Sequence, residues 1–300
     1  MNQALNSPLV IGISSRALFD LKKEDDLYKA EGLEAYTQYQ IKHEDSILDV
    51  GAGFPLVKAI LKLNEFLPNN NKSEVVLMSK NNADTSLRIF NSIKHHELDI
   101  TRAALTSGES LVPYLEAYGV DLYLSATRSD VVAAVNAGVA AAFIYEPPKA
   151  SFNPSSEQLR IAFDGDAVIF SEESENIYQQ EGLAAFLKHE ERNASQPLPD
   201  GPFAKLLKTL SFLQSNIHSE PSPIRTALVT ARNSPAHERV IRTLRVWGVR
   251  VDEVFFLGGI PKTEILRAFR AHIFFDDSHL NLLNSSKHVP CAQVPSSRFE

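Results

Sequence analysis

The feature that most constrains the fold of this 300-residue chain is an internal repeat of about half its length. The segment 9–19 aligns with the segment 159–169, and the apolar positions of the two coincide at an offset of 150 residues. The same offset places Tyr28 on Tyr178 and aligns Glu-Gly-Leu at 31–33 with Glu-Gly-Leu at 181–183. A period of this length indicates two copies of a domain-sized unit rather than an array of short repeats.

After an insertion or deletion in the polar stretches, the alignment continues at an offset of 151 residues. It superposes 77–81 on 228–232 and 122–126 on 273–277. Because the register holds through several segments, we interpret the repeat as a duplication. The two halves predicted in this way are residues 1–150 and residues 151–300.

Each half has the pattern of an α/β domain. Short apolar runs bounded by polar or glycine positions predict buried parallel strands, in the second half at 159–163, 226–229, 254–257 and 273–275. Amphipathic segments between them predict helices, one of which carries Trp247 on its core-facing stripe. The alternation predicts a Rossmann-like, mainly parallel sheet in each half with helices on both faces. A long insertion separates the first two strands of each half, at about 20–73 and 171–223, and we expect it to form a helical cap.

Composition and charge narrow the class of protein. Hydrophobic residues make up 44% of the chain and charged residues 22%, which is typical of a folded globular protein. A net charge of −7 argues against a nucleic-acid polymer as partner. The single cysteine, Cys291, cannot form an internal disulfide, and no segment reads as a secretory signal or a membrane span. We therefore expect a cytoplasmic protein without a membrane partner.

Polar residues suited to phosphoryl chemistry follow each of the four strands predicted in the second half. In chain order they are Asp164 and Asp166, then Thr230, then Lys262, and finally Asp276 and Asp277. The carboxyl ends of parallel strands meet at one edge of the sheet, where ligands gather. Carboxylates there can act as nucleophile, general acid and ligands of a divalent cation, while a hydroxyl and an ammonium can meet phosphoryl oxygens. Each signal alone is typical of a turn or cap, but four at successive strand ends indicate a phosphoryl-transfer site.

The order Asp-x-Asp, Thr, Lys, Asp-Asp resembles the haloacid dehalogenase (HAD-like) superfamily of phosphotransferases. More narrowly, the sequence is similar to the cytosolic 5′-nucleotidase type I family in five stretches. These are the stretch 163–175, which contains Asp-Gly-Asp-Ala-Val from Asp164, then Thr-Ala-Arg at 230–232, Leu-Arg-x-Trp-Gly at 244–248, Asp-Glu-x-Phe-Phe-Leu-x-Gly at 252–259 and Phe-Phe-Asp-Asp at 274–277. The resemblance covers most of the chain. It implies a HAD-like fold and magnesium-dependent hydrolysis of nucleoside 5′-monophosphates, typically with AMP among the favoured substrates.

The resemblance also implies a role for each matched residue. Asp164 would be the nucleophile that forms an aspartyl-phosphate. Asp166 would protonate the leaving nucleoside oxygen and then activate water. Thr230 and Lys262 would hold the phosphoryl oxygens, and Lys262 would also neutralise their charge.

The other implied contacts concern magnesium and the substrate. The ligands implied for Mg²⁺ are Asp164, the backbone carbonyl of Asp166, and one or both of Asp276 and Asp277. Ala231 and Arg232 would join Thr230 and Lys262 in binding the substrate. For Arg232, an ion pair at the surface is an equal alternative to a contact with the phosphate or sugar.

The first half lacks these groups at the aligned positions. Ser14 stands for Asp164, Arg16 for Asp166, Ser79 for Thr230, Leu111 for Lys262, and Ser125-Ala126 for Asp276-Asp277. We therefore expect a degenerate copy that cannot hold the cation and that buttresses the catalytic half, completes its nucleotide pocket or binds an effector. Its polar residues around Ser14 and Ser79 either cradle an anion without metal or form satisfied strand-end turns.

Other interpretations stay open at this point. A HAD-type phosphatase acting on another phosphomonoester, such as a sugar phosphate, would need the same residues, and a non-catalytic nucleotide-binding protein would not need the acids. The stretch Ile-Leu-Asp-Val-Gly-Ala-Gly at 47–53 imitates a methyltransferase motif, but residues 54–56 break its glycine pattern, so we interpret it as cap structure. Base preference, homo-oligomer formation and the identity of any nucleotide effector lie beyond the sequence.

Overall fold

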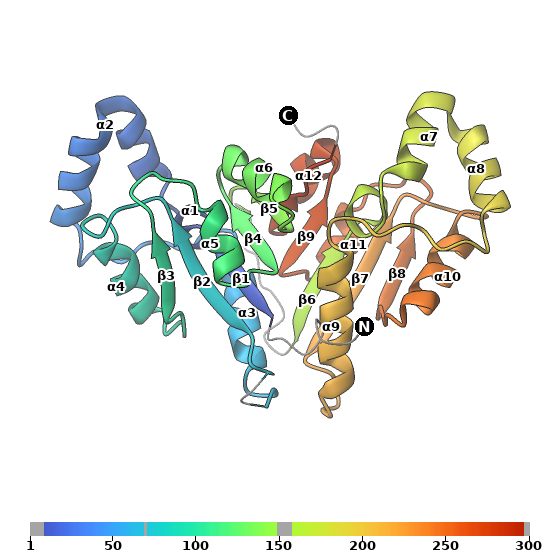
Figure 1. The fold of residues 1–300 in the computed structure, drawn as a ribbon, viewed down its shortest axis with the longest axis horizontal. Helices are drawn as coiled ribbons and strands as arrows, with labels where there is room; N and C mark the ends of the chain where they lie inside the picture. Colours follow the sequence, from blue (N-terminus) through green and yellow to red (C-terminus); the bar gives the residue numbers. More distant parts are fainter. Residues whose placement is uncertain (1–8, 69–70, 149–157, 297–300) are drawn as a thin grey trace. The chain divides into compact units, whose positions relative to one another are not determined.

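Each half of the chain folds around five parallel strands in a computed structural model that describes residues 9–68, 71–148 and 158–296 (Figure 1). The chain separates into an amino-terminal unit, Ser7–Pro147, and a carboxyl-terminal unit, Pro148–Glu300. The predicted boundary between residues 150 and 151 lies outside the described residues, as does the amino-terminal segment before Leu9. The alternation of strands and helices confirms the α/β class with parallel sheets.

The amino-terminal unit has the strand order β3-β2-β1-β4-β5, with every neighbouring pair parallel. Every residue of its central strands β1 and β4 is buried, as expected for a parallel sheet with helices on both faces. Its elements are β1 (Val10–Ile13), α1 (Ser15–Leu18), α2 (Lys22–Lys42), α3 (Phe54–Leu63), β2 (Glu74–Ser79), α4 (Leu87–His95), β3 (Arg102–Leu105), α5 (Val112–Ala117), β4 (Leu122–Ser125), α6 (Arg128–Asn136) and β5 (Ala141–Ile144).

The carboxyl-terminal unit has the strand order β8-β7-β6-β9-β10, again with parallel neighbours. All four strands predicted in this half are present. Its elements are β6 (Leu159–Phe163), the turn η2 (Gly165–Ile169), α7 (Glu173–Glu181), α8 (Leu183–Arg192), α9 (Ala204–Asn216), β7 (Ile224–Thr230), α10 (His237–Trp247), β8 (Glu253–Phe256), α11 (Thr263–Phe269), β9 (Ile273–Asp276), α12 (His279–Ser285) and β10 (Cys291–Gln293).

The strand order of the carboxyl-terminal unit reverses direction between β6 and β9. The chain runs outward from β6 through β7 to β8, then returns to the other side of β6 with β9 and β10. Right-handed crossovers therefore place α9 and α10 on one face and α11 and α12 on the other. A reversal of this kind opens a crevice at the carboxyl ends of the two central strands, the usual ligand position in such sheets.

The insertion at 171–223 is only partly a cap. Its last helix, α9, buries Leu206, Leu207, Leu210 and Leu213 and is the crossover helix that two parallel strands require. Only α7 and α8 form a separate helical hairpin, which lies away from α9 in Figure 1. The hairpin bends at Gly182, where φ is 83°, and α2 bends in the same way at Gly32, where φ is 84°. No atom crowds either glycine, so the backbone conformation itself requires glycine at both bends.

The two units differ by one residue directly after their first strands. Phe19 bridges Val50, and Phe170 bridges Asp200, so Phe19 corresponds to Phe170 and not to Ile169 as the sequence alignment predicted. The extra residue lies in η2, where Ala167 adopts a left-handed conformation with φ 61°. Asp166 and Ala167 together therefore fill the turn that Arg16 fills alone.

Candidate active site

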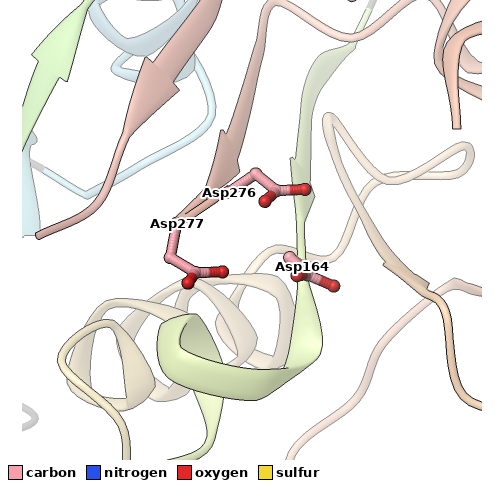
Figure 2. A group of neighbouring side chains, drawn as sticks. All are labelled: Asp164, Asp276 and Asp277. Carbon is pink, nitrogen blue, oxygen red and sulfur yellow. The ribbon is translucent and has the colours of Figure 1, made fainter. Parts of the chain in front are cut away.

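Three buried aspartates meet where the strand order reverses. Asp164 directly follows β6, Asp276 ends β9, and Asp277 is the next residue. Because β6 and β9 are paired through Phe163 and Phe275, the residues after them emerge side by side. Carboxylate oxygens of the three aspartates lie within 4.8 Å of one another, and Figure 2 shows the three carboxyl groups gathered at the ends of the two strands.

Lys262 supplies a positive charge to this acidic cluster. Its Nζ lies 2.7 Å from Oδ1 of Asp164 and 2.8 Å from Oδ2 of Asp276. Burial by itself lowers the pKa of Lys262, but the two carboxylates outweigh burial and raise it, so the ammonium stays charged. Burial raises the pKa of Asp164, Lys262 opposes that rise, and Asp276 and Asp277 reinforce it.

The acidic cluster fits a divalent cation. Three buried carboxylates lie close together beside the Lys262 ammonium, and a divalent cation among them would offset their mutual repulsion. All three carboxylates offer oxygen, the ligand that Mg²⁺ prefers. Asp164, Asp276 and Asp277 are therefore the side chains that would hold the ion.

Asp276 has further partners that sequence reasoning missed. Its Oδ1 accepts a hydrogen bond from the backbone N–H of Ser278 at 2.7 Å, and its Oδ2 accepts one from Nδ2 of Asn281 at 3.1 Å. These donors fix the orientation of the Asp276 carboxylate between Lys262 and the other acids. Asn281 lies in the short helix α12, and no motif distinguishes it in the sequence.

The carboxylate of Asp166 lies outside the acidic cluster and is bound by Arg232. Nη2 and Nε of Arg232 reach its two oxygens at 2.6 and 2.8 Å. The guanidinium also binds Glu190 and stacks over the ring of Phe186, at 5.3 Å from the ring centroid. Arg232 thus forms an ion pair, one of its two predicted roles, but the pair is buried and not at the surface.

Glu190 is the second residue that sequence reasoning missed. It is buried in α8, accepts a hydrogen bond from Oγ of Ser174 at 2.7 Å, and binds both Arg232 and Arg239. The one available signal is its position four residues after Phe186, which places it on the buried face of the helix. Through Glu190, the hairpin of α7 and α8 is tied to the residue that holds Asp166.

Thr230 lies directly against the turn that follows Asp164. A Cβ at Gly165 would stand 3.2 Å from Oγ1 of Thr230, so the glycine permits this close approach. Thr230 is buried at the end of β7, and its Oγ1 accepts a hydrogen bond from the backbone N–H of Arg232 at 3.3 Å. Ala231, the other residue predicted to bind substrate, is exposed beside it.

Comparison with known proteins agrees with this geometry. A model of the 5′-nucleotidase family matches residues 1–300. The chain belongs to the 5′-nucleotidase family. It is similar to cytosolic 5′-nucleotidase 1B of Homo sapiens, with 40% identity over 279 residues, 90% of this chain and 46% of the human protein. This 5′-nucleotidase family member therefore spans about half the length of that curated relative, and no solved structure was found to match it.

The methyltransferase-like stretch has a structural role in this 5′-nucleotidase family member. A Cβ at Gly51 would stand 2.8 Å from the carbonyl oxygen of Ala17, and one at Gly53 would stand 2.9 Å from the same oxygen. The two glycines therefore allow the chain to pass close to the α1 backbone. Within the described part of the chain, no helix combines the length and apolarity needed to cross a membrane.

Proposed function

We propose that this chain hydrolyses nucleoside 5′-monophosphates, AMP among them, to a nucleoside and phosphate, with Mg²⁺ as cofactor. The observation that carries the proposal is the gathering of Asp164, Lys262, Asp276 and Asp277 at the switch point of the sheet, in a chain of the 5′-nucleotidase family. The human relative is named a cytosolic 5′-nucleotidase, which supports both the substrate class and a cytoplasmic location.

In the first step Asp164 would attack the phosphorus atom. Its Oδ1 binds Lys262 and the N–H of Gly165, both at 2.7 Å, which leaves Oδ2 as the attacking oxygen. The new P–O bond forms as the bond to the nucleoside 5′-oxygen breaks, and Asp166 donates a proton to that oxygen. A magnesium ion bound by the acidic cluster would neutralise the phosphoryl charge. Lys262 and the Thr230 hydroxyl would hold the phosphoryl oxygens.

In the second step water would release the phosphate from Asp164. Asp166 accepts a proton from the water, the water oxygen bonds to phosphorus, and the bond to Asp164 breaks. Because Nε and Nη2 of Arg232 each bind one oxygen of Asp166, the guanidinium fixes the orientation of this carboxyl group. Arg232 is thus a positioning residue for Asp166.

We propose further that the amino-terminal unit is a degenerate copy of the carboxyl-terminal unit. Their strand orders correspond, and the bends at Gly32 and Gly182 have the same backbone conformation. The hydroxyls that replace the catalytic acids are used in strand-end turns: Ser14 Oγ accepts from the N–H of Ala17 at 3.3 Å, and Ser125 Oγ accepts from the N–H of Thr127 at 3.1 Å.

A buried ion pair supports this relationship because it is present in both units with one partner moved. In the amino-terminal unit Arg88 pairs with Glu24 at 2.6 Å, and Gln40 is buried nearby on the same helix as Glu24. In the carboxyl-terminal unit Arg239 pairs with Glu190 at 3.0 Å. Glu190 aligns with Gln40, and Ser174 aligns with Glu24. The carboxylate has therefore exchanged places with a neutral residue while the arginine has stayed.

A substrate panel tests the proposed activity. We expect phosphate release from AMP in Mg²⁺ with kcat/KM at least about tenfold above that for ribose 5-phosphate or glucose 6-phosphate, because the base adds binding energy that sugar phosphates lack. A preference for a sugar phosphate would favour the other phosphatase interpretation. Binding of AMP without hydrolysis of any phosphomonoester would favour a non-catalytic nucleotide-binding protein.

A further inference from the structure

The amino-terminal unit contains a cavity of about 470 Å³ at the carboxyl ends of its strands. Its floor includes Ser14, which follows β1, and Ser79, which ends β2. Its walls include Tyr28, Leu33 and Tyr36 from the two arms of α2. The cavity has the size of sites that bind small molecules, and it occupies the topological position that holds the acidic cluster in the carboxyl-terminal unit.

The charges around this cavity are already paired. Arg16 is bound to Asp25 at 2.9 Å, and Lys80 is bound to Asp130 at 2.6 Å. Glu24, the other charged residue among the described lining, is bound to Arg88. A phosphate would have to compete with a carboxylate for either cation, and the floor has serine hydroxyls where a cation would need acids. The cavity therefore favours an uncharged ligand over an anion or a metal complex.

The α2 side of the cavity offers a surface for a flat ring. Tyr28 is 49% exposed and Leu33 is 60% exposed, although both are large apolar side chains that ordinarily gain by burial. Tyr28 is held edge-on to Tyr36, with ring centroids 5.9 Å apart and an interplanar angle of 83°. An aromatic ligand packed on this surface would cover both exposed side chains.

The sheet side of the cavity offers hydrogen bonds. Oγ of Ser15 and Oγ of Ser79 lie 3.3 Å apart and can both donate and accept. Asn81 accepts a hydrogen bond from the hydroxyl of Tyr36 at 3.3 Å, but its Nδ2 is buried without a partner. A buried donor without an acceptor costs free energy that a ligand hydroxyl or ring nitrogen would recover.

We propose that this cavity binds an uncharged nucleoside without a metal ion, with the base against Tyr28 and the sugar hydroxyls toward Ser79 and Asn81. The apolar wall fits a ring, the hydroxyls of the floor fit a hydroxylated ligand, and the paired charges fit a ligand without charge. Together these features favour an uncharged, hydroxylated ring compound. The choice of a nucleoside within that class rests on the proposed function, whose organic product is a nucleoside. The amino-terminal unit would then contain a second binding site, which takes the nucleoside that the carboxyl-terminal unit releases.

Calorimetric titration of the full chain with adenosine in EDTA tests this site. We expect one saturable site, with AMP binding at least about tenfold more weakly because its phosphate meets no free cation. Tyr28→Ala and, separately, Leu33→Ala should each weaken adenosine binding at least about fivefold, a loss of one apolar contact. The matched control is Tyr178→Ala, at the equivalent exposed position in the carboxyl-terminal unit, which should leave the affinity within twofold.

Several results would overturn the proposal. These are the absence of saturable adenosine binding, AMP binding as tightly as adenosine in EDTA, or a loss of binding in Tyr178→Ala but not in Tyr28→Ala. Phosphate release from AMP by the wild-type chain is measured in parallel with Mg²⁺. Adenosine binding without phosphate release would refute the proposed function alone, and phosphate release without adenosine binding in EDTA would refute the second site alone.

Discussion

Replacing Glu190 by glutamine should destabilise the carboxyl-terminal unit more than any surface charge change. Glu190 is buried between two arginines, Arg232 and Arg239, and glutamine keeps its shape while removing its charge. Breaking a buried ion pair from one side costs about 3–5 kcal/mol. Arg232 keeps Asp166 as a partner, and the glutamine oxygen can still accept a hydrogen bond, so we expect the lower end, about 3 kcal/mol.

Urea unfolding followed by fluorescence measures this loss. The single tryptophan, Trp247, packs against Phe170 in the same unit at a centroid distance of 5.6 Å and reports on its unfolding. A loss of about 3 kcal/mol in the free energy of unfolding corresponds to a decrease of about 6–12 °C in Tm for a unit of this size. The control is Glu191→Gln, at the exposed neighbouring position, which should change the free energy by less than about 0.5 kcal/mol. A loss below about 1 kcal/mol in Glu190→Gln would refute the reasoning.

Three further predictions concern the site and the core. Gly165→Ala should lower kcat/KM about tenfold, because the new Cβ at 3.2 Å displaces the Thr230 hydroxyl, and steady-state kinetics showing a change below twofold would contradict this. Cys291 should resist a thiol reagent at pH 8 in the folded chain and should react fully in guanidinium, because burial raises the pKa of the thiol and keeps it neutral. Rapid reaction of the folded chain would count against this. Mg²⁺ added after EDTA treatment should restore activity and should raise Tm, because the ion relieves repulsion in the acidic cluster. Asp277→Asn should reduce that rise in Tm. An equal rise in Tm in the wild type and in Asp277→Asn would show that the ion binds elsewhere.

The sequence predicted the residues of the acidic cluster because their placement depends on topology alone. Asp164 and Asp276 each end an apolar run, and parallel strands bring such ends to one edge. The pairing of Asp166 with Arg232 could not be predicted, because Asp166 lies in the irregular turn η2, where the strand pattern does not determine the direction of a side chain. Glu190 was missed because a glutamate in an amphipathic helix is ordinarily on the solvated face.

Two errors in the predicted fold also have physical causes. The insertion was interpreted as one cap, but a parallel pair such as β6 and β7 needs a crossover helix, and α9 is that helix. The alignment placed Phe19 on Ile169 because an ungapped match preserves the apolar pattern equally well. Only the backbone shows the extra residue at Ala167, which a left-handed conformation accommodates without disturbing the bridge at Phe170.

The most direct test of the central claim compares Asp164→Asn with Ser14→Ala in an assay of phosphate release from AMP. The two residues each follow the first strand of their unit, so the pair distinguishes the unit that we propose to be catalytic from its proposed degenerate copy. We expect Asp164→Asn to lower kcat by at least about 1,000-fold, as removal of a nucleophile does, with the fold retained by circular dichroism, and Ser14→Ala to keep kcat within about threefold. If folded Asp164→Asn kept kcat within tenfold of the wild type, or if Ser14→Ala caused the larger loss, the assignment of the active site to the carboxyl-terminal unit would be wrong.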